Sequence, residues 1–367
     1  MSKSQEQVYE DLANYLDTLP IGFPRTKSGV EIRLLKHMFD PDEAKIAIHL
    51  SLIPIEPEKL WKRKLKNSGL SVDQLKEKLE TMAKKGAIFR YRKDQDVYYS
   101  IAFLAVGMFE YQVKRLSKEF ADDFKQYMNE AFVKEFTTTK IPQLRVIPIE
   151  QSVEHKNIIG NYDALKELVM GERGKIAVAE CICRKMHDLQ GYHCSHIRES
   201  CFTFGGAADY YIENGLGREV SKEDALQILK KAQEEGLVLQ PGNTQRPFAI
   251  CTCCGCCCEV LSTLKKFENP VEFIYSNFYS EINPELCVSC GSCIERCQMD
   301  AISMGETSAV VDLKRCIGCG VCVPACPQDA ILLKKKEKEV EIPKNTAELY
   351  MKIGEVKNRM KSSAQNQ

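Results

Sequence analysis

The first half of the chain contains no cysteine, since none of the 18 cysteines precedes Cys181. A charge imbalance is also missing, because 51 Lys and Arg residues face 51 Asp and Glu residues. Proteins whose main task is nucleic-acid binding usually carry a basic excess, so nucleic acid is not an expected partner. No apolar run is long enough to cross a bilayer, and residues 1–20 lack the apolar core of a secretory signal. We therefore expect a cytoplasmic protein without a membrane span.

Nucleotide-binding motifs are absent as well. No G-x-G-x-x-G follows a predicted strand in a βαβ setting, and no Walker A motif occurs, so flavin, nicotinamide and ATP sites are not supported. The composition is that of a globular protein, with 44% hydrophobic and 28% charged residues. A chain of 367 residues is long enough for two or three compact units.

The cysteines are clustered rather than dispersed, and six of them lie between Cys251 and Cys258. In a reducing cytoplasm, clustered thiols indicate metal ligands rather than disulfides. Burial as small hydrophobic side chains could explain one or two of them, but not this density.

Two cysteine sets near the C-terminus share the spacing C-x2-C-x2-C-x3-C. Every cysteine of the first set precedes its counterpart by the same distance, as Cys287 precedes Cys316, and the residues Asp-Ala-Ile follow both sets. The segment is therefore an internal duplication. The two sets are Cys287, Cys290, Cys293 and Cys297, and Cys316, Cys319, Cys322 and Cys326 followed by Pro327.

This duplicated segment, residues 278–334, resembles a bacterial-type dicluster ferredoxin. In that motif three cysteines bind one [4Fe–4S] cluster and the fourth binds the other cluster. The resemblance implies one cluster on Cys287, Cys290, Cys293 and Cys326, and a second on Cys316, Cys319, Cys322 and Cys297. One departure is Gln298, which stands where the pattern prefers proline but removes no ligand.

Ten further cysteines lie in the middle of the chain. Cys181 and Cys183 follow a strand expected at 176–179, and Cys251 and Cys253 follow another expected at 248–250. If these strands are neighbours, both pairs meet at one sheet edge. The remaining six are Cys194 and Cys201, expected in a loop with His193 and His196, and Cys254, Cys256, Cys257 and Cys258.

These ten thiols indicate two sites better than one. Neighbouring strand residues point to opposite faces, so Cys253 and Cys254, or Cys256 and Cys257, are not expected to serve one centre. We expect one or two further iron–sulfur clusters, with a structural zinc site as the alternative. For His187, His193 and His196 a surface or hydrogen-bonding role is favoured over metal binding.

The remaining pattern predicts an α+β multidomain protein. Helices capped by Ser28, Asp40 and Ser71 precede a hairpin over 87–103, which resembles a winged helix. A continuous amphipathic helix is expected at 108–135 and a linker at 137–148. The expected units are a winged-helix-like domain at 1–135, a Cys-rich α/β domain at 136–275, a dicluster ferredoxin-like domain at 276–335 and a charged helical tail at 336–367.

The whole chain is similar to a family of cytoplasmic proteins of anaerobic bacteria that has no assigned reaction. The resemblance covers residues 20–355, and it rests on stretches such as "AVAECICRK", "ICTCCGCCCEVL" and "RCIGCGVCVPACPQDAI". It implies a winged-helix-like N-terminus, a Cys-rich middle domain and a C-terminal ferredoxin domain.

Three functions are consistent with these features. The first is an electron-transfer protein that relays low-potential electrons to or from an oxidoreductase or another redox protein, rather than a stand-alone enzyme. The second is a redox-sensing winged-helix regulator that binds DNA through a basic face. The residues of this face would be Lys62, Arg63, Lys64, Lys84, Lys85, Arg90, Arg92 and Lys93. Acidic residues on the would-be recognition helix, Asp73, Glu77 and Glu80, argue against it. The third is an oxidoreductase whose middle cluster binds substrate at an iron without a cysteine ligand.

Overall fold

The structure is a computed structural model that describes residues 3–152 and 163–365. The predicted N-terminal helices and the hairpin are present, and the hairpin strands pair in register from Phe89 with Ser100 to Lys93 with Asp96. The elements of this part are α1 (Lys3–Asp17), α2 (Val30–Met38), α3 (Pro41–Ala47), α4 (Pro57–Leu60), α5 (Val72–Lys84), β1 (Phe89–Lys93) and β2 (Asp96–Ser100).

Two of the three predicted helix caps are confirmed. Asp40 and Ser71 each form a capping box with the residue three positions later. The Ser28 cap is wrong, because α2 begins after Gly29, which adopts φ 68°. The Ser28 hydroxyl instead donates to Glu130 over 2.7 Å, and Glu31 pairs with Arg25 at 3.1 Å. Ser28 and Glu31, which the local pattern assigned to a capping box, therefore make contacts with other residues instead.

The continuous helix expected at 108–135 is broken. Ser117 caps a new helix by accepting from the Phe120 amide over 3.1 Å, so the chain turns before α6. Stacking of the Phe109 and Phe124 rings, with centroids 3.7 Å apart, holds the two sides of the break together. The pieces are a 3-10 turn (Glu110–Gln112), α6 (Lys118–Tyr127), a π turn (Met128–Phe132) and α7 (Val133–Thr138).

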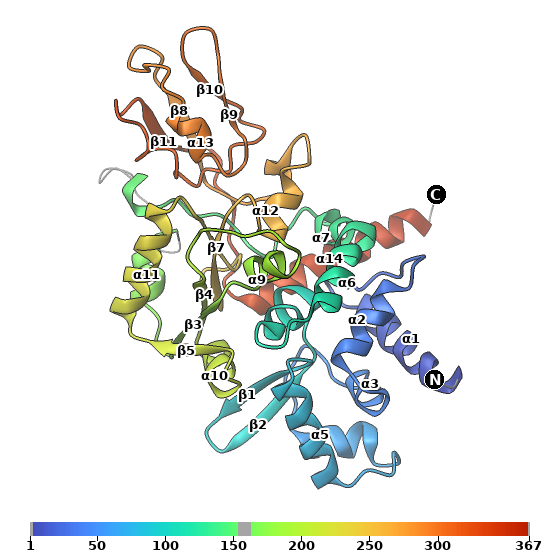
Figure 1. Ribbon diagram of the computed structural model, residues 1–367. Coiled ribbons are helices and arrows are strands. Elements are labelled where there is room, and N and C mark those ends of the chain that lie inside the picture. The colour runs from blue at the N-terminus through green and yellow to red at the C-terminus, as the bar shows by residue number, and fades with distance from the viewer. Residues whose placement is uncertain (1–2, 153–162, 366–367) are drawn as a thin grey trace.

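The middle of the chain forms one five-stranded antiparallel sheet in the order β5-β3-β4-β7-β6. The loop expected around Cys201 is wrong, because this cysteine lies in β4. The strand separates β3 from β7, so these two run in the same direction and end at the same edge without being neighbours (Figure 1). The strands are β3 (Ile176–Glu180), β4 (Glu199–Phe204), β5 (Gly217–Val220), β6 (Val238–Pro241) and β7 (Ala249–Cys253).

The two faces of the sheet pack against different layers. Ala177 and Ala179 of β3 join the core of the N-terminal helices, while Ile176 and Val178 face the opposite core. Figure 1 shows α11 on the side of the sheet away from the N-terminal helices. The helices of this part are α8 (Leu165–Met170), α9 (Ile182–Leu189), α10 (Gly206–Glu213), α11 (Lys222–Glu234) and α12 (Glu259–Leu264).

The duplicated segment forms a separate lobe at one end of the molecule (Figure 1). Its halves repeat the same backbone: Gly291 and Gly320 adopt φ 81° and 73°, and Asp300 and Asp329 adopt φ 51° and 48°. Its elements are β8 (Phe278–Ile282), α13 (Ser292–Arg296), β9 (Ile302–Met304), β10 (Ala309–Val311) and β11 (Ile331–Lys335), with β8 paired to β11 and β9 to β10.

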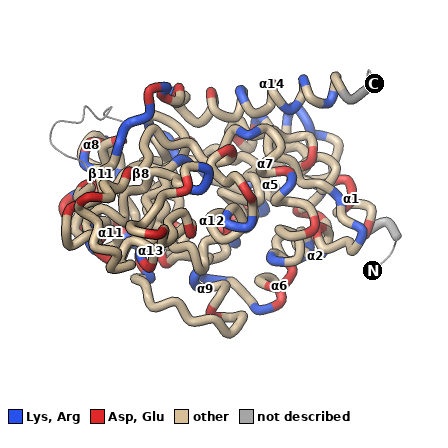
Figure 2. Tube along the Cα trace, turned by 90° about the horizontal axis from the view of Figure 1, so that it is seen from above, with Lys and Arg blue, Asp and Glu red and all other residues tan. Residues whose placement is uncertain are grey.

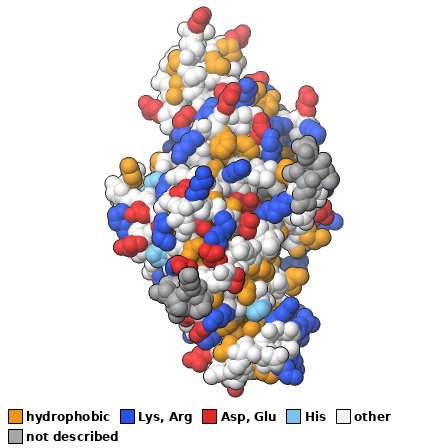
Figure 3. All heavy atoms as spheres, turned by 90° about the vertical axis from the view of Figure 1, so that its right-hand side faces the viewer, with side chains coloured by type: hydrophobic (Ala, Val, Ile, Leu, Met, Phe, Trp, Pro, Cys, Tyr) orange, Lys and Arg blue, Asp and Glu red, His pale blue; other side chains and the backbone are white. Residues whose placement is uncertain are grey.

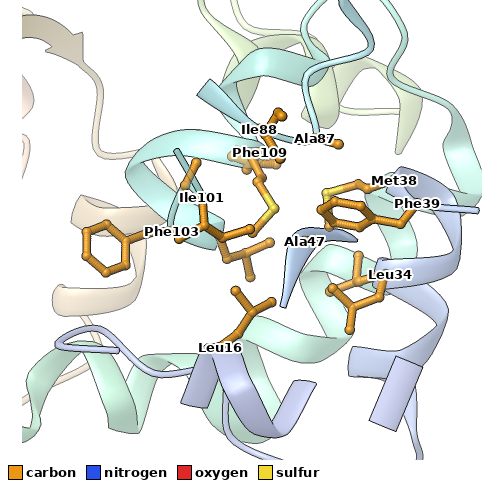
Figure 4. Packing of buried hydrophobic residues seen from close by; sticks show 14 of the residues in the cluster. Leu16, Leu34, Met38, Phe39, Ala47, Ala87, Ile88, Ile101, Phe103 and Phe109 are labelled. Carbon is orange, nitrogen blue, oxygen red and sulfur yellow. The ribbon is translucent and has the colours of Figure 1, made fainter. Parts of the chain in front are cut away.

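One apolar core runs from α1 through the N-terminal helices to α10 and the C-terminal helix. Figure 4 shows its N-terminal part, where Leu16, Leu34 and Phe109 are among the packed residues. The segment expected as a linker at 137–148 packs against the sheet, since Ile147 is buried and forms a bridge to Leu239 of β6. The predicted C-terminal helix is present as α14 (Thr346–Gln365). Ile353 packs in the core, and Lys357 pairs with Glu135 at 2.5 Å.

Charged residues of both signs are mixed along the chain (Figure 2), and their side chains are interspersed on the face shown in Figure 3. Within residues 3–152 and 163–365, none of the helices combines the length and the apolar character needed to span a bilayer.

We expect α14 to be part of the folded core. Replacing fully buried Ile353 with Ala should lower the free energy of unfolding by about 2–5 kcal/mol, because it leaves a cavity among the N-terminal helices. Met351 lies on the same helix and is 66% exposed, so Met351→Ala should change it by less than about 0.5 kcal/mol. Denaturant unfolding under anaerobic conditions measures both, and equal effects would contradict the packing of α14.

Candidate iron–sulfur and metal centres

The structure brings together the four cysteines of the first predicted ligand set, here called the outer set: Cys287, Cys290, Cys293 and Cys326. They line one cavity of about 20 Å³ together with apolar side chains such as Ile282 and Ile331. Left-handed backbone at Ser289 and Gly291 curls the loop around this cavity. Cys290 is exposed, so the outer set reaches the surface.

The other four form the inner set: Cys297, Cys316, Cys319 and Cys322. They line a second cavity of about 20 Å³. Ser280 donates its amide to the Cys316 sulfur over 3.4 Å, and its hydroxyl lies 3.3 Å from the Cys322 sulfur. Gly318 approaches β8 so closely that a Cβ would lie 2.1 Å from the Phe278 carbonyl oxygen. Cys316 and Cys322 are therefore buried under the β8–β11 ribbon, whereas Cys297 and Cys319 are half-buried.

Both sets fit [4Fe–4S] clusters on their chemistry. Each offers four thiols around an apolar space, which is the donor set that such clusters require. Backbone amides also reach the sulfur atoms, as Ala301 reaches Cys297 over 3.2 Å and Ala330 reaches Cys326 over 3.3 Å. These donors stabilise thiolate charge, and the two halves of the duplication supply them at equivalent positions.

The ten middle cysteines separate into two groups in space. The first, here called the cavity group, comprises Cys181, Cys183, Cys201, Cys251, Cys253 and Cys258, which line a cavity of about 80 Å³. Cys254 also borders this cavity, but its sulfur atom lies with the second group. Cys201 and Cys251 are direct partners in the β4–β7 pairing. Cys181 and Cys258 immediately precede α9 and α12, so the ends of β3 and β7 deliver the thiols to one edge.

Hydrogen bonds link the cavity-group thiols to one another. A hydrogen bond from Cys183 lowers the pKa of Cys181 to about 6, and hydrogen bonds from Cys183 and Cys253 lower the pKa of Cys258 well below its usual value. The same hydrogen bonds raise the pKa of Cys183 and Cys253 well above the usual value, so the arrangement favours the thiolate, the form that binds metal, at Cys181 and Cys258 only.

The opposite wall of the same cavity comes from the N-terminal helices. It is mainly apolar, with Phe109, Phe124 and Phe132 among its residues. Two carboxyl groups line the cavity, those of Glu110 and Glu259. The Glu110 carboxylate accepts a hydrogen bond from the Gly107 amide over 2.6 Å. Burial raises the pKa of Glu110 to about 7. Nothing in the local pattern around Glu110 marks it as a cavity residue.

Arg184 is fully buried between the two groups of thiols. Its guanidinium donates to the Ile197 carbonyl over 2.8 Å, the Ser200 hydroxyl over 2.6 Å and the Thr252 carbonyl over 2.9 Å. The other basic residues near the thiols in sequence are engaged elsewhere, since Lys185 pairs with Glu180 and Arg198 with Asp188.

The second group, here called the loop group, comprises Cys194, Cys254, Cys256 and Cys257. The Cys194 sulfur lies 3.9 Å from the sulfur atoms of both Cys254 and Cys256. Cys257 is buried in the same small cluster as Cys194 and Cys254. Cys256 and Cys257 both lie in a turn rather than in a strand, so the alternation of strand faces does not apply to this pair.

Among the three histidines considered as ligands, only His196 lies with the thiols. His187 instead contacts Glu259 at 3.2 Å, and His193 is exposed and lies 3.4 Å from Asp188.

A close contact joins the loop group to the ferredoxin lobe. The Gly255 amide donates to the Gln298 side-chain oxygen over 2.7 Å, and a Cβ on Gly255 would lie 2.1 Å from the Gln298 carbonyl oxygen. Gln298, which stands where the ferredoxin pattern prefers proline, therefore connects the lobe to the middle cysteines.

Comparison with known proteins identifies the lobe. Two family models described as 4Fe-4S dicluster domain match residues 280–333 and 315–357. No curated protein and no solved structure matches the chain. The C-terminal region is thus a ferredoxin-type 4Fe–4S domain, and the chain is an iron–sulfur protein.

We expect Gly255→Ala to weaken the contact between the turn of the loop group and Gln298 of the ferredoxin lobe. The added methyl group collides with the Gln298 backbone, which should cost about 1–3 kcal/mol of unfolding free energy. Gly354→Ala is the control, because the nearest heavy atom to its Cβ is 3.6 Å away and Ala favours the helix. Thermal unfolding of both variants measures the difference, and an unchanged Gly255→Ala midpoint would argue against the contact.

Proposed function

We propose that this iron–sulfur protein is an electron-transfer protein, which relays low-potential electrons to or from an oxidoreductase partner. The observation that carries the proposal is the grouping of eight thiols into two sets around two cavities, of which only the outer set includes an exposed cysteine, Cys290. A bound [4Fe–4S] cluster supplies one-electron chemistry at low potential.

The ligands that we propose are the outer set for one cluster and the inner set for the other. Ile282, Val288 and Ile331 keep water from the outer cavity, and amide donors near the sulfur atoms favour added negative charge. At the inner cavity, Ser280 supplies both an amide and a hydroxyl contact to thiols. Solvent exposure therefore distinguishes two sites of otherwise similar chemistry.

The cavity group is the proposed place of a further cluster. Hydrogen bonds link all six thiols in the order Cys181, Cys183, Cys258, Cys253, Cys251 and Cys201, so neighbours in this order form the candidate ligand sets. The buried Arg184 supplies positive charge beside Cys181 and Cys253, and this charge offsets that of clustered thiolates.

The exposed outer set offers a place for a redox partner to dock. Leu286 is 50% exposed and Val288 60% exposed beside Cys290, and Glu285 and Glu295 are exposed nearby. An apolar centre with acidic surroundings suits a protein partner with an apolar contact and basic residues around it.

A DNA-binding role for the winged-helix-like region is less well supported. Arg90 is buried and its guanidinium contacts Glu80 and Glu213 at 2.6 Å each. Arg92 contacts Glu213 at 2.9 Å. Two of the cations needed for phosphate contacts are therefore occupied, and β1 packs against α10. We propose that this region serves protein contacts, and its hairpin already makes one within the chain.

The cavity favours a second candidate function, that of an oxidoreductase acting on a small apolar molecule. Its apolar wall and the carboxyl group of Glu110 lie opposite the thiols. EPR spectra of the reduced protein distinguish the two functions. A small ligand such as cyanide should leave the spectrum unchanged if all irons have protein ligands, and should shift it if one iron is open.

The ligand assignment predicts the iron content of point variants. The full chain should hold at least about eight irons, and Cys290→Ser and Cys319→Ser should each lose up to about four with a matching loss of electron transfer to cytochrome c. Ser289→Ala changes an exposed side chain between two proposed ligands and should keep the full content. Iron and sulfide analysis of anaerobically purified protein tests this. Equal losses in all three variants would refute the assignment.

We also expect no binding of duplex DNA by the full chain at about 150 mM salt, because phosphate binding depends on free Lys and Arg. Fluorescence anisotropy with random and selected duplexes, in oxidised and reduced states, measures it. Tight binding of one defined duplex would favour the redox-sensing regulator instead.

A further inference from the structure

The loop group differs from every other thiol set in how closely its donor atoms lie. Donor atoms of Cys194, His196, Cys254 and Cys256 all lie within 4.8 Å of one another. Among the described residues, no three thiols of the outer set, the inner set or the cavity group meet this condition. Those sets surround cavities, whereas the loop-group sulfur atoms are in contact.

This spacing separates two kinds of metal centre. Four thiolates of a cubane bind four different irons, so the body of the cluster keeps their sulfur atoms apart. A single tetrahedral ion with metal–sulfur bonds of about 2.3 Å places two of its sulfur ligands about 3.8 Å apart. Cys194 lies 3.9 Å from both Cys254 and Cys256, which matches the single ion.

The surroundings of His196 also suit a metal ligand. Its Nδ1 lies 3.5 Å from the Glu235 carboxylate, which leaves Nε2 for coordination. A ligating histidine usually gives its other N–H to such a carboxylate, which fixes the tautomer and the ring orientation. The same carboxylate accepts from the Ile197 amide over 2.8 Å, so it holds the backbone beside the histidine as well.

We propose that Cys194, His196, Cys254 and Cys256 bind one zinc ion, separate from the iron–sulfur clusters. Three thiolates and one imidazole in a tetrahedral arrangement select zinc among the common divalent ions. Cys257 packs beside the site against Ala232 and Leu237 and is not a ligand.

A zinc ion here has a positional role. It joins the 190–197 loop to the turn after β7, two segments that otherwise meet through few apolar side chains. That turn also carries Gly255, which contacts Gln298 of the ferredoxin lobe, while Cys253 and Cys258 on either side of it line the cavity. Because zinc does not change oxidation state, it would fix the distance between the lobe and the cavity in every redox state.

Metal analysis of the full chain, purified anaerobically after growth with iron and zinc, tests the proposal. We expect about one zinc per chain, and zinc-edge X-ray absorption should show three sulfur neighbours and one nitrogen neighbour. His196→Ala and Cys256→Ser should lose most of the zinc while iron stays unchanged. His196→Cys should retain it, because a fourth thiolate replaces the imidazole.

His193→Ala is the matched control. It removes an exposed histidine three residues away, and zinc should stay at the level of the unaltered chain. Two results would overturn the proposal. One is a chain without zinc in which Cys256→Ser removes iron. The other is loss of zinc in Cys257→Ser with retention in His196→Ala, since the ion would then have four cysteine ligands.

Discussion

The buried guanidinium of Arg184 holds the cysteine-rich part of the chain in place. Arg184 lies on α9, and its guanidinium donates hydrogen bonds to the Ile197 carbonyl, the Ser200 hydroxyl and the Thr252 carbonyl. One side chain therefore connects α9 with the loop before β4, with β4 and with β7. A buried cation needs negative charge nearby, and the thiolates of both middle groups provide it. Cysteines of the loop group and of the cavity group therefore lie close to the same buried guanidinium.

The course of β7 decides which thiol joins which group. Cys251 and Cys253 leave the strand toward the cavity, and the chain then turns at Gly255, where a side chain would collide with the ferredoxin lobe. Cys254 and Cys256 thus meet Cys194, and Cys258 returns to the cavity at the start of α12. Six cysteines in eight residues serve two places because a strand, a tight turn and a helix follow one another within them.

The grouping of the eight ferredoxin-lobe cysteines into two sets was predictable from the sequence, because the fixed spacing of the cysteines is typical of a known loop structure. The hairpin and the capped helices α3 and α5 were predictable for the same reason, because their signals are local. Contacts between distant segments were not. The Ser28 hydroxyl contacts Glu130 instead of capping a helix. β4 lies between β3 and β7, although Cys201 of this strand was expected in a loop. Glu110 carried no signal, because its position opposite the thiols arises only when the N-terminal helices pack on the sheet.

Sulfur spacing adds information that sequence spacing lacks. The cysteine run between Cys251 and Cys258 is compatible with a [4Fe–4S] cluster or with a single metal ion, because both can be bound by four cysteine thiolates. In space the two differ, since thiols around a cavity leave room for several irons, while thiols in contact leave room for one ion. The chain thus combines centres that change oxidation state with one that we propose does not. The position of the second beside Arg184 and Gly255 suits a protein that must keep its redox sites at a fixed separation.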